Sequence, residues 1–143
     1  MTRSYAYRHL ITLDETNLAG NVYFAHYLRW QGHCRERFLA EHAPGVLGAL
    51  ANGFTLVTTT CDCQYLGELT AGDTVELRMT LTELDDNRVG MAFDYLRVNA
   101  PVPQLVARGG QSVACMSRGP EGLVPVPVPA ELRNSLHPYS ATR

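Results

Sequence analysis

The chain has 143 residues, of which 45% are hydrophobic and 18% charged, and its formal net charge is -2. This length suits one domain that buries roughly two-thirds of its unfolded surface, so we expect a single domain over residues 1–143. The near-neutral charge excludes the basic patches that bind nucleic acid, and no stretch approaches the roughly 20 apolar residues that cross a membrane. The N-terminus also lacks the apolar run of a signal peptide, which indicates a cytoplasmic protein.

The first third of the chain is predicted to hold one strand and one long helix. Residues 4–13 (SYAYRHLITL) combine β-forming residues with a partial alternation of large and polar side chains, as in a strand. Residues 14–20 contain Asp, Thr, Asn and Gly, which are typical of a turn. A helical pattern without internal proline then covers residues 22–42, and Pro44 with Gly45 ends it.

One side of the predicted helix is almost wholly aromatic. On a wheel of about 100° per residue, the side chains within roughly 60° of Tyr27 are Tyr23, Phe24, Tyr27, Trp30, Cys34 and Phe38. Such a stripe is typical of a helix packed into a core. Arg35 and Arg37 lie about 80° to either side of Tyr27, at the two edges of the stripe.

Four further segments are predicted to be consecutive antiparallel strands, because they are rich in β-branched residues or alternate apolar with polar side chains. They cover residues 54–66, 74–84, 88–98 and 104–117. The turn residues Asp85–Asn87 join the second and third of these strands as a hairpin. Gly109 and Gly110 in the last strand suggest a bulge or the close approach of another backbone.

The tail from about residue 119 is a Pro-rich extension with a short helix that begins near Pro129. We expect this tail to lie on the surface of the domain or against a partner subunit. The order of one strand, one long helix and four strands predicts an α+β fold, because an antiparallel sheet with one apolar face can wrap around a single apolar helix.

The cysteines and histidines lack the spacing of metal sites. Cys34, Cys61, Cys63 and Cys115 include no C-x-x-C pair, and we interpret them as buried thiols, with Cys61 and Cys63 on one face of a strand. The five histidines show no metal-ligand spacing either. No phosphate-binding loop or serine-hydrolase elbow occurs, so the sequence predicts no metal and no nucleotide.

The most informative segment is ETNLAGNVYFAHYLRW, residues 15–30, in which a Gly-containing turn leads into the aromatic helix. It resembles the hotdog-fold acyl thioesterases of the 4-hydroxybenzoyl-CoA type, whose pattern is roughly D-x-x-G-x-V-aromatic-aromatic-x-x-Y-x-R-W. The longer stretch TLDETNLAGNVYFAHYLRWQGHCRERFL looks most like the thioesterases of enediyne polyketide biosynthesis. The resemblance implies a sheet wrapped around one central helix, and a homodimer or dimer of dimers with active sites at subunit interfaces.

The resemblance also implies a reaction. The expected substrate is a long polyene polyketide with a β-keto group, held as a thioester on the acyl carrier protein of an iterative polyketide synthase. Thioesters are already activated, so water can cleave them without a cofactor when it is held in place. Decarboxylation of the freed β-keto acid, whether or not the protein assists it, is left open. Hydrolysis of ordinary acyl-CoA and a non-catalytic acyl-binding module are the alternatives.

Carried over position by position, the acidic catalytic residue of the benzoyl-CoA type falls on Asn17, which is an amide in the enediyne group too. An amide can orient water or a carbonyl but cannot ionise. The family's oxyanion donor, a backbone N–H at the helix start, falls on Phe24, where helical N–H groups lack intrahelical acceptors. The nearby Asp14 and Glu15 could supply a carboxylate, or could cap the helix and complement its dipole.

Four other positions are open to two interpretations. Arg35 and Arg37 are either solvated charges or groups that bind the anionic end of an acyl intermediate. Alternation along its strand would place Thr60 on the wall of an acyl channel, and Tyr27 could close that channel. Ordinary β-propensity and core packing also account for Thr60 and Tyr27.

Overall fold

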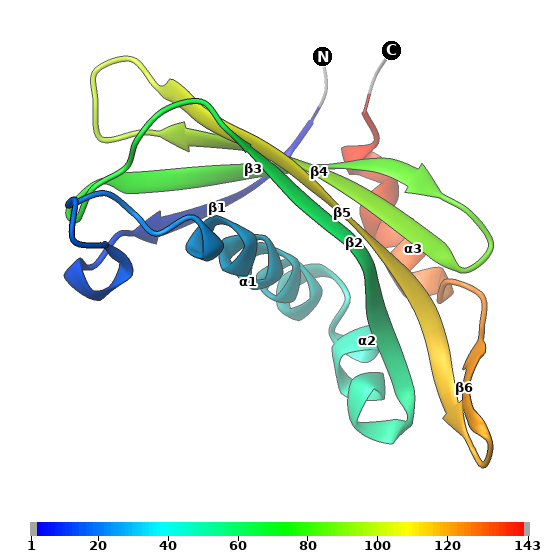
Figure 1. Cartoon of the computed structure of the whole chain (residues 1–143). Coiled ribbons are helices and arrows are strands. Elements are labelled where there is room, and N and C mark those ends of the chain that lie inside the picture. Colours follow the sequence, from blue (N-terminus) through cyan, green and yellow to red (C-terminus); the bar gives the residue numbers. More distant parts are fainter. Residues whose placement is uncertain (1–2, 142–143) are drawn as a thin grey trace.

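An antiparallel sheet curves around one long helix in the computed structural model, which describes residues 3–141 (Figure 1). The strands are β1 (Tyr5–Leu10), β2 (Phe54–Tyr65), β3 (Thr74–Leu84), β4 (Arg88–Arg97), β5 (Gln104–Gly119) and β6 (Gly122–Pro125). The helices are α1 (Ala25–His42), α2 (Pro44–Ala49) and α3 (Ala130–Leu136), with 3₁₀ turns η1 (Leu13–Glu15), η2 (Leu50–Asn52) and η3 (His137–Tyr139). The predicted α+β class is confirmed.

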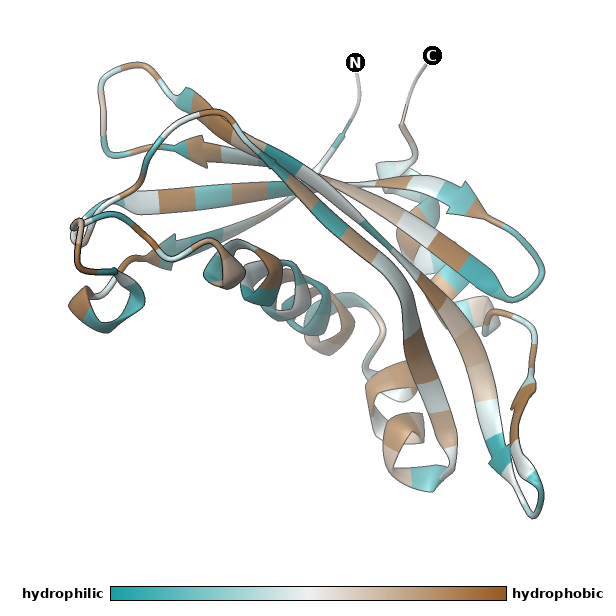
Figure 2. Ribbon diagram, viewed as in Figure 1, coloured by the Kyte–Doolittle hydropathy of each residue, from teal (hydrophilic) through white to brown (hydrophobic). Residues whose placement is uncertain are grey.

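The strands are ordered β1-β3-β4-β5-β2 in the sheet, and β6 pairs with the end of β5. The predicted hairpin is confirmed, because β3 and β4 pair directly. Alternation along β3 is visible as bands of opposite hydropathy (Figure 2). Strand β2 precedes β3 in the chain but pairs with β5, so β2 forms one edge of the sheet. None of the helices within residues 3–141 is long and apolar enough to span a membrane.

Helix α1 begins at Ala25, three residues later than predicted. The later start determines which side chains of the aromatic stripe are buried. The helical members of the stripe are buried, as expected: Tyr27, Trp30, Cys34 and Phe38. Tyr23 and Phe24 are instead 47% and 56% exposed, so their assignment to the core is wrong. They precede the helix, where the 100° wheel no longer applies.

Pro44 ends α1 as predicted, but it also begins a second helix that the sequence did not reveal. Helix α1 stops at His42, and Pro44 occupies the first turn of α2. Proline is tolerated there because its missing N–H would have no intrahelical acceptor. The carboxylate of Glu131 in α3 accepts a hydrogen bond from the Val46 N–H (2.8 Å) and so caps the start of α2.

The first part of the tail, residues 121–127, lies mostly exposed on the surface, as predicted, whereas the residues that follow pack into the core. Its short helix begins where predicted, with Pro129 at the position before α3. The buried apolar side chains that it contributes to the main hydrophobic cluster are Val128, Leu132, Leu136 and Tyr139. Burial of these apolar side chains holds the end of the tail against the main hydrophobic cluster.

Gly109 lies where another backbone approaches β5, as predicted. A Cβ atom at this position would stand 2.5 Å from both the Asp62 carbonyl oxygen and the Gln31 side-chain nitrogen. The cysteine prediction is only partly confirmed, because Cys34 and Cys115 are buried whereas Cys61 is exposed.

Candidate functional site

A tight turn before α1 fixes Asn17. The Asn17 N–H donates to the Asn21 carbonyl, and the Gly20 N–H donates to the Asn17 carbonyl, both at 2.9 Å. Gly20 closes the turn with a φ of 91°, a conformation that glycine adopts without steric cost. The Asn17 Oδ1 accepts the Ala19 N–H at 2.9 Å. This leaves Nδ2 as the free end of the amide, with no acceptor among residues 3–141, so Asn17 can donate a hydrogen bond to a ligand.

The backbone N–H of Phe24 is also free. The preceding N–H, of Tyr23, donates to the Glu15 carbonyl (3.0 Å), whereas no acceptor within the described part of the chain takes the Phe24 N–H. No side chain caps the start of α1. The Phe24 carbonyl is fixed from outside the helix, since the Tyr65 hydroxyl donates to it at 2.9 Å. A donor at a helix start adds to the positive end of the helix dipole.

One cavity of about 280 Å³ brings these groups together. Its lining residues come from the turn, the start of α1 and the segment after β2: Asn17, Asn21, Val22, Phe24, Tyr27, Tyr65, Gly67, Glu68 and Leu69. Tyr27 is buried and packs edge-on against the Tyr65 ring, with centroids 4.9 Å apart. Tyr27 therefore serves both interpretations, since it is a core residue that also forms a wall of the cavity.

Both oxygens of Glu15, the buried carboxylate nearest Asn17 in sequence, accept hydrogen bonds. It accepts hydrogen bonds from His9 Nε2 (2.8 Å), Trp30 Nε1 (3.0 Å) and the Thr12 N–H (2.9 Å). Although burial opposes ionisation, these donors lower the pKa of Glu15 to about 2. Such a carboxylate is a poor base. Glu15 also caps η1 together with Thr12, and does not cap α1.

Arg35 lies in a buried polar row between α1 and the sheet. Its Nη1 donates to Gln111 Oε1 (2.9 Å), Gln111 Nε2 donates to Gln31 Oε1 (3.2 Å), and Gln31 Nε2 donates to the Asp62 carbonyl (3.0 Å). Burial lowers the pKa of the Arg35 guanidinium. Its Nε is buried and has no hydrogen-bond partner in residues 3–141.

The glutamine partners of Arg35 were missed at the sequence level, although a signal existed. Gln31 follows Tyr27 by four residues and therefore lies within roughly 60° of the centre of the aromatic stripe. It is fully buried. A polar side chain on an apolar helix face must find hydrogen-bond partners, and this requirement predicts a buried network.

Neither arginine shares the Asn17 cavity. Arg35 follows Phe24 by eleven residues, which corresponds to about 16 Å along a helix that rises 1.5 Å per residue. Arg37 is exposed, and its guanidinium lies 5.6 Å from the centroid of the Tyr7 ring on β1. Within one protomer, therefore, neither arginine can contact a carbonyl bound at the Phe24 N–H.

Thr60 does not line this cavity either. The register of β2 shifts between Thr58 and Thr60, and this irregularity reverses the alternation of side chains. Cys61 consequently faces α1, where its thiol donates to Gln31 Oε1 (3.3 Å). Thr60 is exposed on the opposite face, away from Cys61, so its role in an acyl channel stays a prediction.

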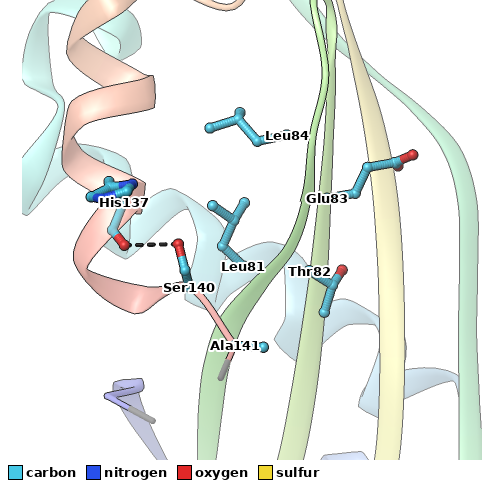
Figure 3. Close-up of a pocket in the computed structure, with 7 residues that line it drawn as sticks. All are labelled: Leu81, Thr82, Glu83, Leu84, His137, Ser140 and Ala141. Atoms are coloured by element: carbon cyan, nitrogen blue, oxygen red, sulfur yellow. Dashed lines mark hydrogen bonds between the residues drawn. The ribbon is translucent and has the colours of Figure 1, made fainter. Parts of the chain in front are cut away.

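Another cavity, of about 350 Å³, shares no lining residue with the Asn17 cavity (Figure 3). It is lined by the end of β3 and the tail: Leu81, Thr82, Glu83, Leu84, His137, Ser140 and Ala141. The hydrogen bond drawn between its residues joins the Ser140 hydroxyl to the His137 carbonyl at 2.8 Å. No predicted site residue lines it, whereas three of them, Asn17, Phe24 and Tyr27, line the Asn17 cavity, which we take as the candidate site.

The candidate site can activate a carbonyl group. Asn17 and Phe24 line one cavity, and neither the Asn17 side-chain N–H groups nor the Phe24 backbone N–H has an acceptor within residues 3–141. Donors fixed in advance stabilise the oxyanion that forms when a carbonyl is attacked, and each is worth roughly 10² to 10³ in rate. The geometry favours acyl transfer chemistry.

Comparison with known proteins agrees with this interpretation. The sequence model of the thioesterase-like superfamily matches residues 11–136, which include the whole candidate site. The chain is 58% identical to the dynemicin thioesterase, with a TM-score of 0.96 over 98% of this chain and 99% of that one. Crystal structures of that enzyme reveal induced-fit and allosteric effects upon polyene binding. No match was found among the curated proteins.

More distant solved structures share the fold. A 1,4-dihydroxy-2-naphthoyl-CoA thioesterase from Synechocystis is 19% identical, with a TM-score of 0.82 over 93% of this chain and 95% of that one. The 4-hydroxybenzoyl CoA thioesterase from Pseudomonas sp. strain CBS-3 is also 19% identical, with a TM-score of 0.77 over 93% and 99%. Both confirm the architecture of one helix wrapped by an antiparallel sheet.

Proposed function

The chain belongs to the thioesterase-like superfamily and is a hotdog-fold thioesterase of the enediyne polyketide type, and we propose that an acyl carrier protein presents its substrate. That substrate is a long polyene chain with a β-keto group, held as a thioester by an iterative polyketide synthase. The proposal is carried by the cavity that Asn17 and Phe24 line together, since the side-chain amide of Asn17 and the backbone N–H of Phe24 are both free to donate. Full-length similarity to an enzyme that binds a polyene supports the substrate class.

In the proposed mechanism, the thioester carbonyl enters the cavity and accepts hydrogen bonds from Asn17 Nδ2 and the Phe24 N–H. Attack by water moves negative charge onto that oxygen, where both donors become stronger in the transition state. The tetrahedral intermediate then collapses and releases the thiolate of the carrier protein. Asn17 acts as a donor through Nδ2, while its Oδ1 accepts the Ala19 N–H.

The arginines require a second protomer in this mechanism. Arg35 lies about 16 Å along α1 from Phe24, too far to reach the cavity of its own protomer. We propose that the site forms between two copies of the chain, so that Arg35 of one copy polarises the carbonyl or attracts the carboxylate at the cavity of the other. Arg37 lies on the exposed side of α1, and it is the weaker candidate for this role.

Two surfaces support a homodimer, or a dimer of dimers. The first is the free edge of β2, where residues 58–62 are all exposed, since unpaired strand edges are usually covered in stable proteins. The second is the apolar surface beside the cavity, where Phe24 and Tyr23 pack together with ring centroids 4.6 Å apart and Leu18 and Leu66 are exposed. Covering both surfaces with a second copy would also close the cavity.

The released product is a β-keto acid, which can lose carbon dioxide to give a methyl ketone. The described site offers no separate group for that step, so we propose that decarboxylation follows release. Its timing is measurable, since the acid and the ketone differ in mass.

Hydrolysis of the polyene thioester on its carrier protein, compared with the corresponding acyl-CoA, tests the proposed function. We expect faster release from the carrier protein, and a fall of roughly 10² to 10³ in kcat for Asn17→Ala. Mass spectrometry of products from co-expression with an iterative polyketide synthase identifies the chain. Preference for acyl-CoA would assign the protein to general acyl metabolism, and retention of polyene without release would make it a binding module.

A further inference from the structure

The two hydrogen-bond donors of the candidate site cannot remove the proton of the attacking water. Water attacks a thioester efficiently only when a base removes its proton, and Asn17 cannot accept it. We infer that Glu68 is the general base of the hydrolysis, an inference that rests on the proposed function. Glu68 is the carboxylate among the residues that line the Asn17 cavity.

The backbone places Glu68 beside the oxyanion donor. The segment after β2 runs antiparallel to the segment before α1, with Asn21 paired to Thr70 and the Val22 N–H donating to the Leu69 carbonyl at 2.8 Å. Glu68 directly precedes Leu69 in this segment, and it lines the same cavity as Phe24.

One oxygen of Glu68 is anchored and the other is available. Oε1 accepts a hydrogen bond from Asn21 Nδ2 at 3.1 Å, and within residues 3–141 no donor occupies Oε2. This arrangement holds the carboxylate in the cavity and leaves one lone-pair face for water. Glu68 is exposed, so water reaches it from solvent.

Other ionisable groups near the cavity are unsuited to the task. Glu15 is saturated by donors, which hold its pKa at about 2. Tyr27 and Tyr65 also line the cavity, but burial raises the pKa of each to about 12. Both hydroxyls are therefore protonated at neutral pH and cannot act as bases there.

The step balances without a cofactor. The Glu68 carboxylate takes one proton from water while the water oxygen bonds to the carbonyl carbon, and the carbonyl electron pair becomes the oxyanion held by Phe24 N–H and Asn17 Nδ2. Collapse of the oxyanion breaks the carbon–sulfur bond. The proton on Glu68 then passes to the leaving thiolate, so that one thioester and one water give one acid and one thiol.

Glu68→Gln tests the inference with little disturbance, because the Gln oxygen can still accept the Asn21 hydrogen bond. Wild-type hydrolysis of acyl carrier protein thioester is measured first, and its absence would refute the proposed function rather than the role of Glu68. For Glu68→Gln we expect kcat to fall by roughly 10² or more while KM stays within about twofold, as for loss of a general base. The acidic limb of the kcat profile against pH should disappear as well.

Two controls separate a base from a structural residue. Glu121→Gln changes an exposed carboxylate in the β5–β6 turn and should leave kcat unaltered. Hydroxylamine attacks thioesters without base assistance, so acyl transfer to hydroxylamine should proceed in Glu68→Gln at a rate near that of wild type, but slowly in Asn17→Ala. A Glu68→Gln enzyme with kcat within threefold of wild type and an unchanged pH profile would overturn the inference.

Discussion

Replacing Glu15 by Gln should destabilise the fold in a manner that depends on pH. The carboxylate joins β1, the turn and α1 through His9, Thr12 and Trp30, and its pKa falls from 4.5 to about 2 on folding. A shift of this size corresponds to about 3 kcal/mol at neutral pH, which solvent screening near the surface reduces to about 2 kcal/mol. Gln cannot supply this stabilisation, because its side-chain nitrogen would face the Thr12 N–H or the Trp30 Nε1–H, which are donors too.

The sign of the pH dependence follows from the lowered pKa. Stabilisation by Glu15 is complete above about pH 5.5 and is lost as the pH falls from 4.5 towards 2, so the two proteins should converge in acid. Urea unfolding followed by the fluorescence of Trp30, the single tryptophan, measures the difference at each pH. Glu36→Gln, an exposed change on the same helix, is the control. A difference below about 0.5 kcal/mol at pH 7, or one that persists unchanged at pH 2.5, would refute this account.

Two further substitutions test the packing of the fold, and a third tests the role of Thr60 in activity. Gly109→Ala should cost about 1 to 3 kcal/mol in urea unfolding, because its Cβ would press on the Asp62 carbonyl and the Gln31 side chain; a neutral result would contradict that contact. Leu136→Ala should cost about 2 to 5 kcal/mol, since this tail residue is fully buried, whereas a surface extension would lose almost nothing. Thr60→Val should leave kcat within twofold of wild type, because Thr60 does not line the cavity; a large loss of activity would show that Thr60 contributes to the site.

The sequence predicted the fold well where local pattern decides structure. Alternation placed β3 with its bounds correct, and the turn residues located the hairpin. The sequence did not reveal α2, because Pro44 was interpreted only as a helix end although proline also begins helices. It also misjudged the tail, since a polyproline pattern does not show that Leu132 and Leu136 lie against the core.

The candidate site was predictable only in part, for reasons of distance along the chain. Asn17 and Phe24 belong to one turn and helix start, so a local motif identified both. Glu68 lies more than forty residues away, and only the pairing of its segment with Asn21 brings it to the same cavity. The face on which Thr60 lies could not be predicted, because a pattern of threonines does not show the irregularity in the register of β2. The buried position of Arg35 could not be predicted, because a helical wheel gives the direction of a side chain but not how deeply it is buried.

The central claim is that Asn17 works as a hydrogen-bond donor to the thioester oxyanion and not as a substitute for a base. Asn17→Asp tests it most directly, because Oδ1 still accepts the Ala19 N–H while the donor Nδ2 becomes a negatively charged acceptor. Single-turnover hydrolysis of the polyene thioester on its carrier protein should slow by roughly 10² to 10³ with an unchanged unfolding midpoint. Hydrolysis by Asn17→Asp at the wild-type rate or faster would contradict the account.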